Sequence, residues 1–320
     1  MNGIDKVLVV APLFHQTAWE IRLLFESLRR VGFPLQDVVW LSHGGSDVAY
    51  EYALKLVADT GVEFHWYEDD RPKSEYLTSI RPWLIAKYLR EDEAREEHAY
   101  LYIDSDVIVN TIPDAQALGA DEGTWVGSSV SSYAAMGKPD KATRCHLKQV
   151  LGKEAFKKYR YVMPGAQWVL AQPSPEIFAT MYTLCEEVFT AIQADDVCEN
   201  DAWFSDMWAL PAAALHHGVS CVTHEDLDFA LVDDPYEDFY SKPFYHNSGA
   251  TVQSSLLRAV FVKREWKAKS PLGRAHVLSP LYAGYGYVEF MKHLDPDTSI
   301  IDIMMPNVWY GSMRGKSKNR

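Results

Sequence analysis

The 320-residue chain lacks the glycine-rich loops with which many nucleotide-binding enzymes hold phosphates. It contains neither Gly-x-Gly-x-x-Gly nor the full Walker pattern Gly-x-x-x-x-Gly-Lys-Ser/Thr, and residues 11–15 have no glycine where a dinucleotide pyrophosphate would need one. These absences argue against a Rossmann dehydrogenase and against an NTPase. The Gly-x-Ser-x-Gly elbow of serine hydrolases is missing as well.

The chain is also poor in cysteine and has no long apolar run. Its four cysteines are scattered, and no two of them have the spacing of a zinc finger. No apolar stretch reaches about 18 residues, and the N-terminus lacks the charged and apolar regions of a signal peptide. We therefore expect a soluble cytoplasmic protein in a reducing environment, without a membrane span. A Golgi-type enzyme would need an anchor that this sequence does not contain.

Positive charge is scarce except near the C-terminus. The net charge is −13, which gives no sign of a nucleic-acid partner. From residue 255 onward, however, 11 Lys and Arg stand against 5 Asp and Glu. A basic end on an acidic body is compatible with a polyanionic partner. The alternative is a lysine-rich surface that contacts only solvent.

Apolar runs and helical patterns alternate through the first 110 residues. This order predicts βαβ units, and therefore an α/β fold with a mostly parallel central sheet flanked by helices. Ligands of such sheets bind beyond the carboxyl ends of the strands. Farther along, residues 141–158 have the pattern of one helix. The early strands are predicted at 7–12, 38–42 and 62–67, and the helices between them at 16–31, 48–58 and 79–89.

Two carboxylates follow the next predicted strand. Asp104 and Asp106 come directly after the apolar run 100–103 and directly before the apolar run 107–109. Alternation along a strand would point both side chains to one side, where two close carboxylates repel each other unless a cation lies between them. A hard divalent ion such as Mg²⁺ or Mn²⁺ takes oxygen ligands. The alternative is an ordinary turn at a strand end, in which an aspartate caps a helix.

Three further motifs follow in a fixed order. They are Gly-Ala-Gln-Trp-Val-Leu at 165–170, Glu-Asn-Asp-Ala-Trp at 199–203 and His-Asn-Ser-Gly at 246–249. Together with the Asp-x-Asp pair and the βαβ half, they resemble glycosyltransferases of the GT-A fold, in particular the retaining group that contains glycogenin and the lipopolysaccharide galactosyltransferases. The resemblance implies a hexosyl or pentosyl transferase with a nucleotide-sugar donor, for which a UDP-sugar is expected.

The resemblance also implies roles for individual residues. Asp104, Asp106 and His246 match the metal ligands, and the imidazole favours Mn²⁺ over Mg²⁺. If configuration is retained, Asn200 or Gln167 would stabilise the sugar in the transition state; if it is inverted, Asp201 is the better general base. The nucleobase is expected to stack at Ala11 and Pro12. The expected donor contacts are Ala11, Pro12, Arg81, Asp104, Ser105, Gly165, Ala166, Gly249 and Lys269.

One departure from the family concerns the diphosphate. The family follows its His-x-x-Gly with Lys-Pro-Trp, whereas here residues 250–252 read Ala-Thr-Val. The nearest basic segment downstream is 263–271, and one of its lysines, with Lys269 as our choice, is expected to cover the phosphates. Spacing alone does not identify which lysine it is.

Other functions and the acceptor stay open at this point. A sugar nucleotidyltransferase and a non-catalytic nucleotide-sugar-binding module are the alternatives. The acceptor is expected to be a glycan, a protein or a modified DNA base, since the layout also resembles bacteriophage transferases that glycosylate 5-hydroxymethyl pyrimidines; a phage enzyme would act in the host cytoplasm. We expect one domain over 1–313, with a nucleotide-binding half at 1–110, an acceptor and sugar half at 111–313, and a basic tail at 314–320.

Overall fold

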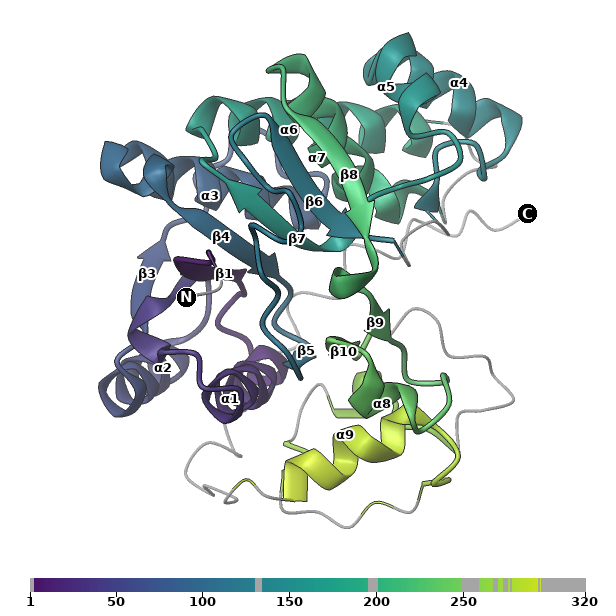
Figure 1. Cartoon of the computed structure of the whole chain (residues 1–320). Coiled ribbons are helices and arrows are strands. Elements are labelled where there is room, and N and C mark those ends of the chain that lie inside the picture. The colour runs from purple at the N-terminus through teal and green to yellow at the C-terminus, as the bar shows by residue number, and fades with distance from the viewer. Residues whose placement is uncertain are drawn as a thin grey trace, which may run out of the picture.

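A seven-stranded sheet forms the centre of the molecule, in the order β3-β2-β1-β4-β7-β6-β8 (Figure 1). The structure is a computed structural model that describes residues 3–129, 134–194, 201–248, 259–266, 270–272, 276, 278–292 and 294. The predicted tail at 314–320 lies outside the described residues. The strands of this sheet are β1 Lys6–Val10, β2 Val38–His43, β3 Glu63–Tyr67, β4 Ala99–Ile103, β6 Thr124–Ser128, β7 Gly165–Ala171 and β8 Ser220–His224.

The sheet is mostly parallel, as the alternation of apolar runs and helical patterns predicts. Strand β1 pairs in parallel with both β2 and β4, and β2 pairs in parallel with β3. Strand β7 runs antiparallel to β4 and β6, so it begins at the edge where β4 ends. The predicted GT-A architecture, an α/β fold with a central sheet between helices, is confirmed.

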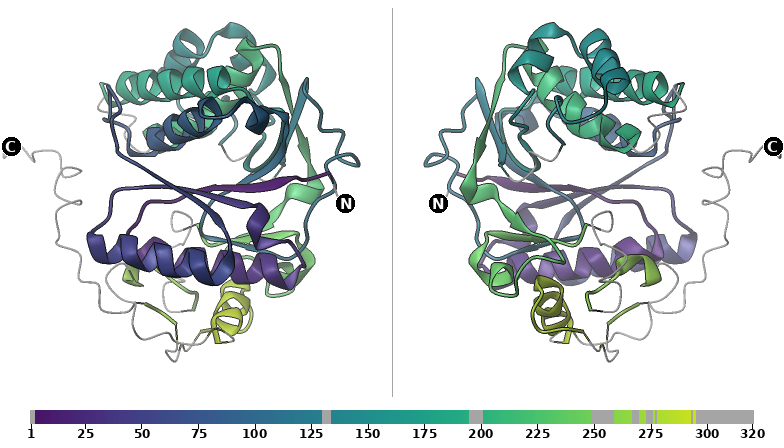
Figure 2. Two further views of the ribbon diagram at one scale, coloured as in Figure 1. Left: turned by 90° about the vertical axis from the view of Figure 1, so that its left-hand side faces the viewer. Right: turned by 90° about the vertical axis from the view of Figure 1, so that its right-hand side faces the viewer.

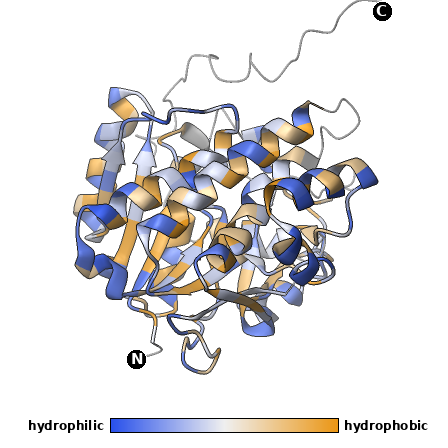
Figure 3. Ribbon diagram, turned by 90° about the horizontal axis from the view of Figure 1, so that it is seen from above, coloured by the Kyte–Doolittle hydropathy of each residue, from blue (hydrophilic) through white to orange (hydrophobic). Residues whose placement is uncertain are grey.

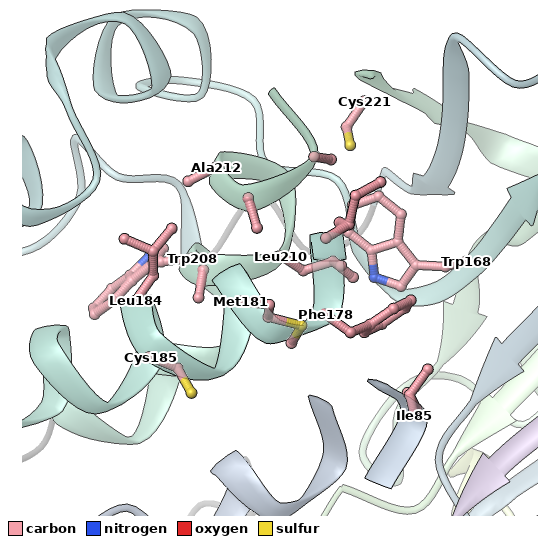
Figure 4. Close-up of a cluster of buried hydrophobic side chains, with 14 of the residues drawn as sticks. Ile85, Trp168, Phe178, Met181, Leu184, Cys185, Trp208, Leu210, Ala212 and Cys221 are labelled. Atoms are coloured by element: carbon pink, nitrogen blue, oxygen red, sulfur yellow. The ribbon is translucent and has the colours of Figure 1, made fainter. Parts of the chain in front are cut away.

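Helices cover both faces of the sheet (Figure 2). Their apolar stripes pack on the buried strands, and the helices on one face show alternating hydrophilic and hydrophobic segments from outside (Figure 3). On that face Phe178, Met181 and Trp208 belong to a cluster that also includes Trp168 of the sheet (Figure 4). One face carries α3 Ile80–Arg90, α6 Pro175–Gln193 and α7 Ser205–His216, and the other carries α1 His15–Arg30 and α2 Asp47–Thr60.

One predicted helix is two helices in the structure. The pattern at 141–158 divides into α4 Lys141–Val150 and α5 Lys153–Lys158. Gly152 separates them with φ of 89°, in a region of conformational space that glycine tolerates and an α-helix cannot contain. The prediction of a continuous helix was therefore wrong, because the amphipathic pattern continues across a turn that the glycine makes.

A second, three-stranded sheet lies below the first, in the order β5-β10-β9 (Figure 1). It packs on α1 and contributes to a hydrophobic cluster that joins Trp19 of α1 to Tyr245 and Phe261 of the C-terminal part of the chain. Among the described residues, no helix combines the length and the apolar character that crossing a bilayer requires. The remaining elements are β5 Val107–Val109, β9 Phe229–Ala230, β10 Phe244–His246, α8 Asp238–Ser241, α9 Ala283–Lys292 and the short 3₁₀ turns η1 Leu35–Asp37, η2 Leu77–Ser79, η3 Glu93–Glu97, η5 Asp201–Phe204, η6 Glu225–Leu227 and η8 Lys263–Trp266.

Candidate metal centre and donor site

The acidic pair lies where the chain passes from the large sheet to the small one. Strand β4 ends at Ile103 in the large sheet, and β5 begins at Val107 in the small sheet. The link between them holds Asp104 and Asp106 at the carboxyl edge of β4. Val9 of β1 pairs with Ile103, and Val10 pairs with Leu41 of β2. The three strand ends therefore meet at one edge, as the parallel arrangement predicts.

His246 reaches the acidic pair through strand pairing. Strand β10 runs antiparallel to β5, with His246 opposite Val107. The next residue, Asn247, donates its peptide N–H to the carbonyl of Asp106 at 2.9 Å. As a result, His246 Nε2 lies 3.3 Å from Asp106 Oδ1 and 3.6 Å from Asp104 Oδ2.

These three side chains fit a divalent metal ion. Their candidate ligand atoms all lie within 4.8 Å of one another, and they come from two carboxylates and one imidazole. Carboxylate oxygens suit Mg²⁺ and Mn²⁺, and an imidazole nitrogen is tolerated better by Mn²⁺. The other ring nitrogen of His246, Nδ1, is buried and has no hydrogen-bond partner among the described residues. The other nitrogen, Nε2, faces the two carboxylates and is the one that a metal would use.

Arg81 holds the other oxygen of Asp104. Its Nη1 lies 2.9 Å from Asp104 Oδ1 and 3.5 Å from Asp206 Oδ2. Asp206 is buried and accepts hydrogen bonds from the Tyr76 hydroxyl at 2.7 Å and from the Met207 peptide N–H at 2.9 Å. Burial raises the pKa of Asp206, and the charge of Arg81 only partly opposes this effect. Asp104 thus turns Oδ1 to Arg81 and Oδ2 to His246.

Lys263 makes the corresponding contact with Asp106. Its ammonium contacts Asp106 Oδ2 and lies 3.7 Å from Oε1 of Glu20. Glu20 belongs to α1 and is 2% exposed, and its Oε2 accepts a hydrogen bond from Ser105 Oγ at 3.4 Å. In each aspartate of the pair, one carboxylate oxygen therefore contacts a basic side chain and the other faces His246.

The charges of this cluster stabilise one another. Burial by itself would raise the pKa of Asp106, but the neighbouring Lys263 and His246 hold it far below its usual range. Burial would lower the pKa of Lys263 and of His246, and the carboxylate of Asp106 raises both of them above their usual values. Asp106 is consequently ionised at neutral pH, which is the state that binds a cation.

The predicted nucleobase residues lie at the adjacent strand ends. Ala11 is fully buried, and its carbonyl accepts hydrogen bonds from Ser42 Oγ at 2.7 Å and Trp40 Nε1 at 3.2 Å. Pro12 is partly exposed. Of the two, Pro12 presents its side chain at the surface, while Ala11 fixes the backbone that carries it.

The predicted sugar-pocket residues begin β7. Gly165 is buried, and Ala166 has φ of 61°, a conformation that costs a non-glycine residue energy and often marks a functional site. Gln167 is fully buried, and within the described part of the chain neither its Oε1 nor its Nε2 has a hydrogen-bond partner. An unpaired buried amide is costly in a folded protein. These features agree with a site that a ligand or ordered water completes.

Several predicted residues cannot be placed. Asn200, Gly249 and Lys269 lie outside the described residues. Asp201 starts the 3₁₀ turn η5, but its side chain is outside what the structure describes.

The sequence reasoning missed Glu20 and Asp206. Glu20 lies on the stripe of α1 that continues with Leu24 and Leu28 at intervals of four residues. A charged residue on an apolar stripe signals a buried, paired charge. Asp206 likewise lies in the first turn of α7, directly before the apolar run 207–215. The sequence pattern indicates Lys263 only as one member of the basic segment 263–271, in which Lys269 is the predicted phosphate contact.

Comparison with solved structures identifies the fold. No protein-family model matches the chain, and neither does any curated protein sequence. Among solved structures, the bifunctional glycosyltransferase WbbM superposes with a TM-score of 0.51 at 11% identity over 94% of this chain. The match covers 51% of WbbM, so the chain spans about half the length of that protein. At this identity the likeness shows a shared fold.

Two further structures are similar over most of their own length. The galactosyltransferase LgtC, solved with donor and acceptor sugar analogues, gives a TM-score of 0.49 at 13% identity, covering 92% of this chain and 98% of LgtC. Mouse xyloside xylosyltransferase 1 gives 0.42 at 12% identity, covering 78% of this chain and 99% of that one.

Proposed function

We propose that the protein is a metal-dependent glycosyltransferase that moves a sugar from a nucleotide-sugar to a hydroxyl acceptor. The observation that carries the proposal is the meeting of Asp104, Asp106 and His246 at the carboxyl edge of the sheet. The fold supports it, because WbbM, which shares that fold, is described as a bifunctional glycosyltransferase. The proposed halves, 1–110 for the nucleotide and 111–313 for the sugar and acceptor, would meet at this edge.

The chain supplies the groups that such a reaction needs. A divalent cation held by Asp104, Asp106 and His246 would act as a Lewis acid for the charge that develops on the departing diphosphate. Arg81 and Lys263 bring two further positive charges to the same place, next to the carboxylates. Oriented cations at a dry site favour an anionic leaving group. Lys263 therefore replaces Lys269 as our candidate for the diphosphate.

The donor and the catalytic side chain remain inferences from the family resemblance. We expect a UDP-sugar, with the base near Pro12 and the sugar near Gly165 and Ala166. Gln167 would approach the reacting sugar if configuration is retained, and its unpaired buried amide supports this role. Asn200 is the other candidate for retention, and Asp201 is the candidate base for inversion.

The acceptor is a glycan, a protein or a modified DNA base. From residue 255 onward the chain has 11 Lys and Arg but only 5 Asp and Glu. This positive charge favours a test with DNA that contains 5-hydroxymethyl pyrimidines. If DNA is the acceptor, its binding should weaken steeply with salt, because phosphate contacts release counterions. Salt-independent binding, or transfer only to glycans or proteins, would exclude DNA.

A panel of nucleotide sugars tests the proposal. The full chain is incubated with UDP-, GDP- and ADP-sugars and Mn²⁺, and sugar release is followed with and without EDTA. A transferase should hydrolyse its preferred donor slowly and only when the metal is present. We expect that donor to be a UDP-sugar. Asp106→Asn should abolish this activity, whereas Asp226→Asn, on an exposed side chain, should not.

The same panel separates the alternatives. A sugar nucleotidyltransferase would instead consume a nucleoside triphosphate and a sugar phosphate, with release of pyrophosphate. A binding module would bind UDP in a metal-dependent manner without turning over any donor. Either result would replace the proposed function.

A further inference from the structure

Glu20 is a buried carboxylate next to the metal centre that the proposed reaction does not use. It lies on α1, far from the Asp-x-Asp pair in the sequence, and is 2% exposed. Its Oε2 accepts from Ser105, the residue between the two aspartates, at 3.4 Å. Its Oε1 lies 3.7 Å from Lys263 Nζ. A buried carboxylate needs a partner, and Lys263 is a cation that lies close to Glu20 among the described residues.

Lys263 is shared between two carboxylates. Its ammonium contacts Asp106 Oδ2 and lies 3.7 Å from Glu20 Oε1. Asp106 turns its other oxygen to His246 Nε2 at 3.3 Å. A divalent cation at the three ligands would therefore approach a carboxylate that already neutralises an ammonium group. The two cations repel each other, and this repulsion is strong in a buried site.

We infer that Glu20 is a positioning residue of the metal centre: it retains the ammonium of Lys263 when a divalent cation takes the charge of Asp106. The inference rests on the proposed function, because the metal belongs to it. With Glu20 present, Lys263 keeps a carboxylate partner while Asp106 exchanges one cation for another. Without Glu20, the carboxylates that act on Lys263 among the described residues are Asp106 and Asp104, which are the candidate metal ligands themselves. The incoming cation then has to compete with a buried ammonium for those carboxylates.

Titration calorimetry of the full chain with MnCl₂ tests this exchange. Glu20→Gln removes the charge with little change of shape and should weaken Mn²⁺ binding by about 10- to 100-fold, the usual effect of losing a residue that supports metal ligands. Lys263→Met removes the competing ammonium and should tighten binding. In the Lys263→Met background, Glu20→Gln should weaken Mn²⁺ binding much less than it does in the wild type, because no ammonium group then needs a carboxylate partner.

The controls use the same helix. Glu26→Gln lies on α1 and alters only a surface pair with Arg29, so its Mn²⁺ affinity should equal that of the wild type. Glu20→Asp keeps the charge and should recover much of the affinity. Thermal unfolding followed by circular dichroism checks that each variant folds. If Glu20→Gln does not fold, the test rests on Lys263→Met. The inference is then overturned if Lys263→Met binds Mn²⁺ no more tightly than the wild type does.

Two results would overturn the role of Glu20. An unchanged affinity in Glu20→Gln would show that the residue does not act on the metal. An equal loss in both backgrounds would show that it acts without Lys263. If the wild type binds Mn²⁺ through Asp106 and either result appears, the inference fails while the proposed function stands. If the predicted differences appear but no sugar is released, the proposed function fails instead. If the wild-type chain binds no Mn²⁺, both the inference on Glu20 and the proposed function are contradicted.

Discussion

His246 Nε2 lies 3.3 Å from Asp106 Oδ1 because β5 and β10 pair in a fixed antiparallel register. The register places His246 opposite Val107 and lets the Asn247 peptide donate to the Asp106 carbonyl at 2.9 Å. Backbone pairing thus sets the distance between two candidate ligands that are remote in sequence. A slip of one residue would turn the imidazole to the other side of the small sheet. The geometry of the candidate metal centre therefore depends on this small sheet as much as on the Asp-x-Asp motif.

Asp106→Asn should abolish Mn²⁺ binding and sugar release. The substitution removes the buried negative charge on which His246 and Lys263 converge and leaves a weak neutral ligand. Calorimetry with MnCl₂ measures the binding, and donor hydrolysis measures the activity. A variant that folds and retains most of either would show that Asp106 is not a ligand.

His246→Ala should change metal preference more than it lowers activity. The two carboxylates remain and still suit Mg²⁺, while the nitrogen ligand that Mn²⁺ tolerates better is lost. The ratio of Mn²⁺- to Mg²⁺-supported sugar release should fall relative to the wild type. An unchanged ratio would show that His246 is a structural histidine.

The sequence predicts the parts of the site that depend on local pattern. Apolar runs followed by polar residues identify the strand ends, and parallel pairing of those strands brings Pro12 and the acidic pair to one edge. The contact between Glu20 and Lys263 cannot be predicted from local pattern. They meet because α1 packs against the small sheet and the C-terminal segment returns to it, and no local pattern encodes that contact.

The choice between lysines shows the same limit. Lys263 and Lys269 occupy one basic segment, and spacing does not distinguish their positions around a site. Within the described residues, Lys263 contacts Asp106 and stands two residues after Phe261, which belongs to the apolar cluster that packs on the small sheet. This contact depends on tertiary packing, which the sequence pattern does not reveal, and Lys269 lies outside the described residues.

Tyr76→Phe should destabilise the fold by about 1–3 kcal/mol, because it leaves a buried carboxylate oxygen with fewer donors. The Tyr76 hydroxyl donates to Asp206 Oδ1 at 2.7 Å, and both residues are buried. Urea unfolding measures the free energy of unfolding. Tyr161→Phe is the matched control, because Tyr161 is 74% exposed and should lose nothing measurable. Equal stabilities of the two variants would contradict the role of the Tyr76 hydroxyl.

The free energy of unfolding should fall as the pH decreases from 6.5 toward 4, partly because of His43. Its side chain is buried at the end of β2, and burial lowers its pKa to about 4; Asp69 opposes this shift and Arg71 adds to it. In the unfolded chain the imidazole takes up a proton near pH 6.5. Below that pH the unfolded state binds more protons than the folded state, so stability falls. By pH 5 the loss from His43 alone should be about 2 kcal/mol.

Substitution of His43 isolates its share of this pH dependence. Urea unfolding of the wild type and of His43→Gln is compared at pH 7.5 and pH 5. The glutamine does not titrate, so the difference between the two pH values should shrink by about 2 kcal/mol in the variant. His216→Gln is the matched control, because it makes the same substitution at an exposed histidine. An identical pH dependence in the wild type and in His43→Gln would mean that His43 accepts a proton as readily in the folded protein as in the unfolded chain.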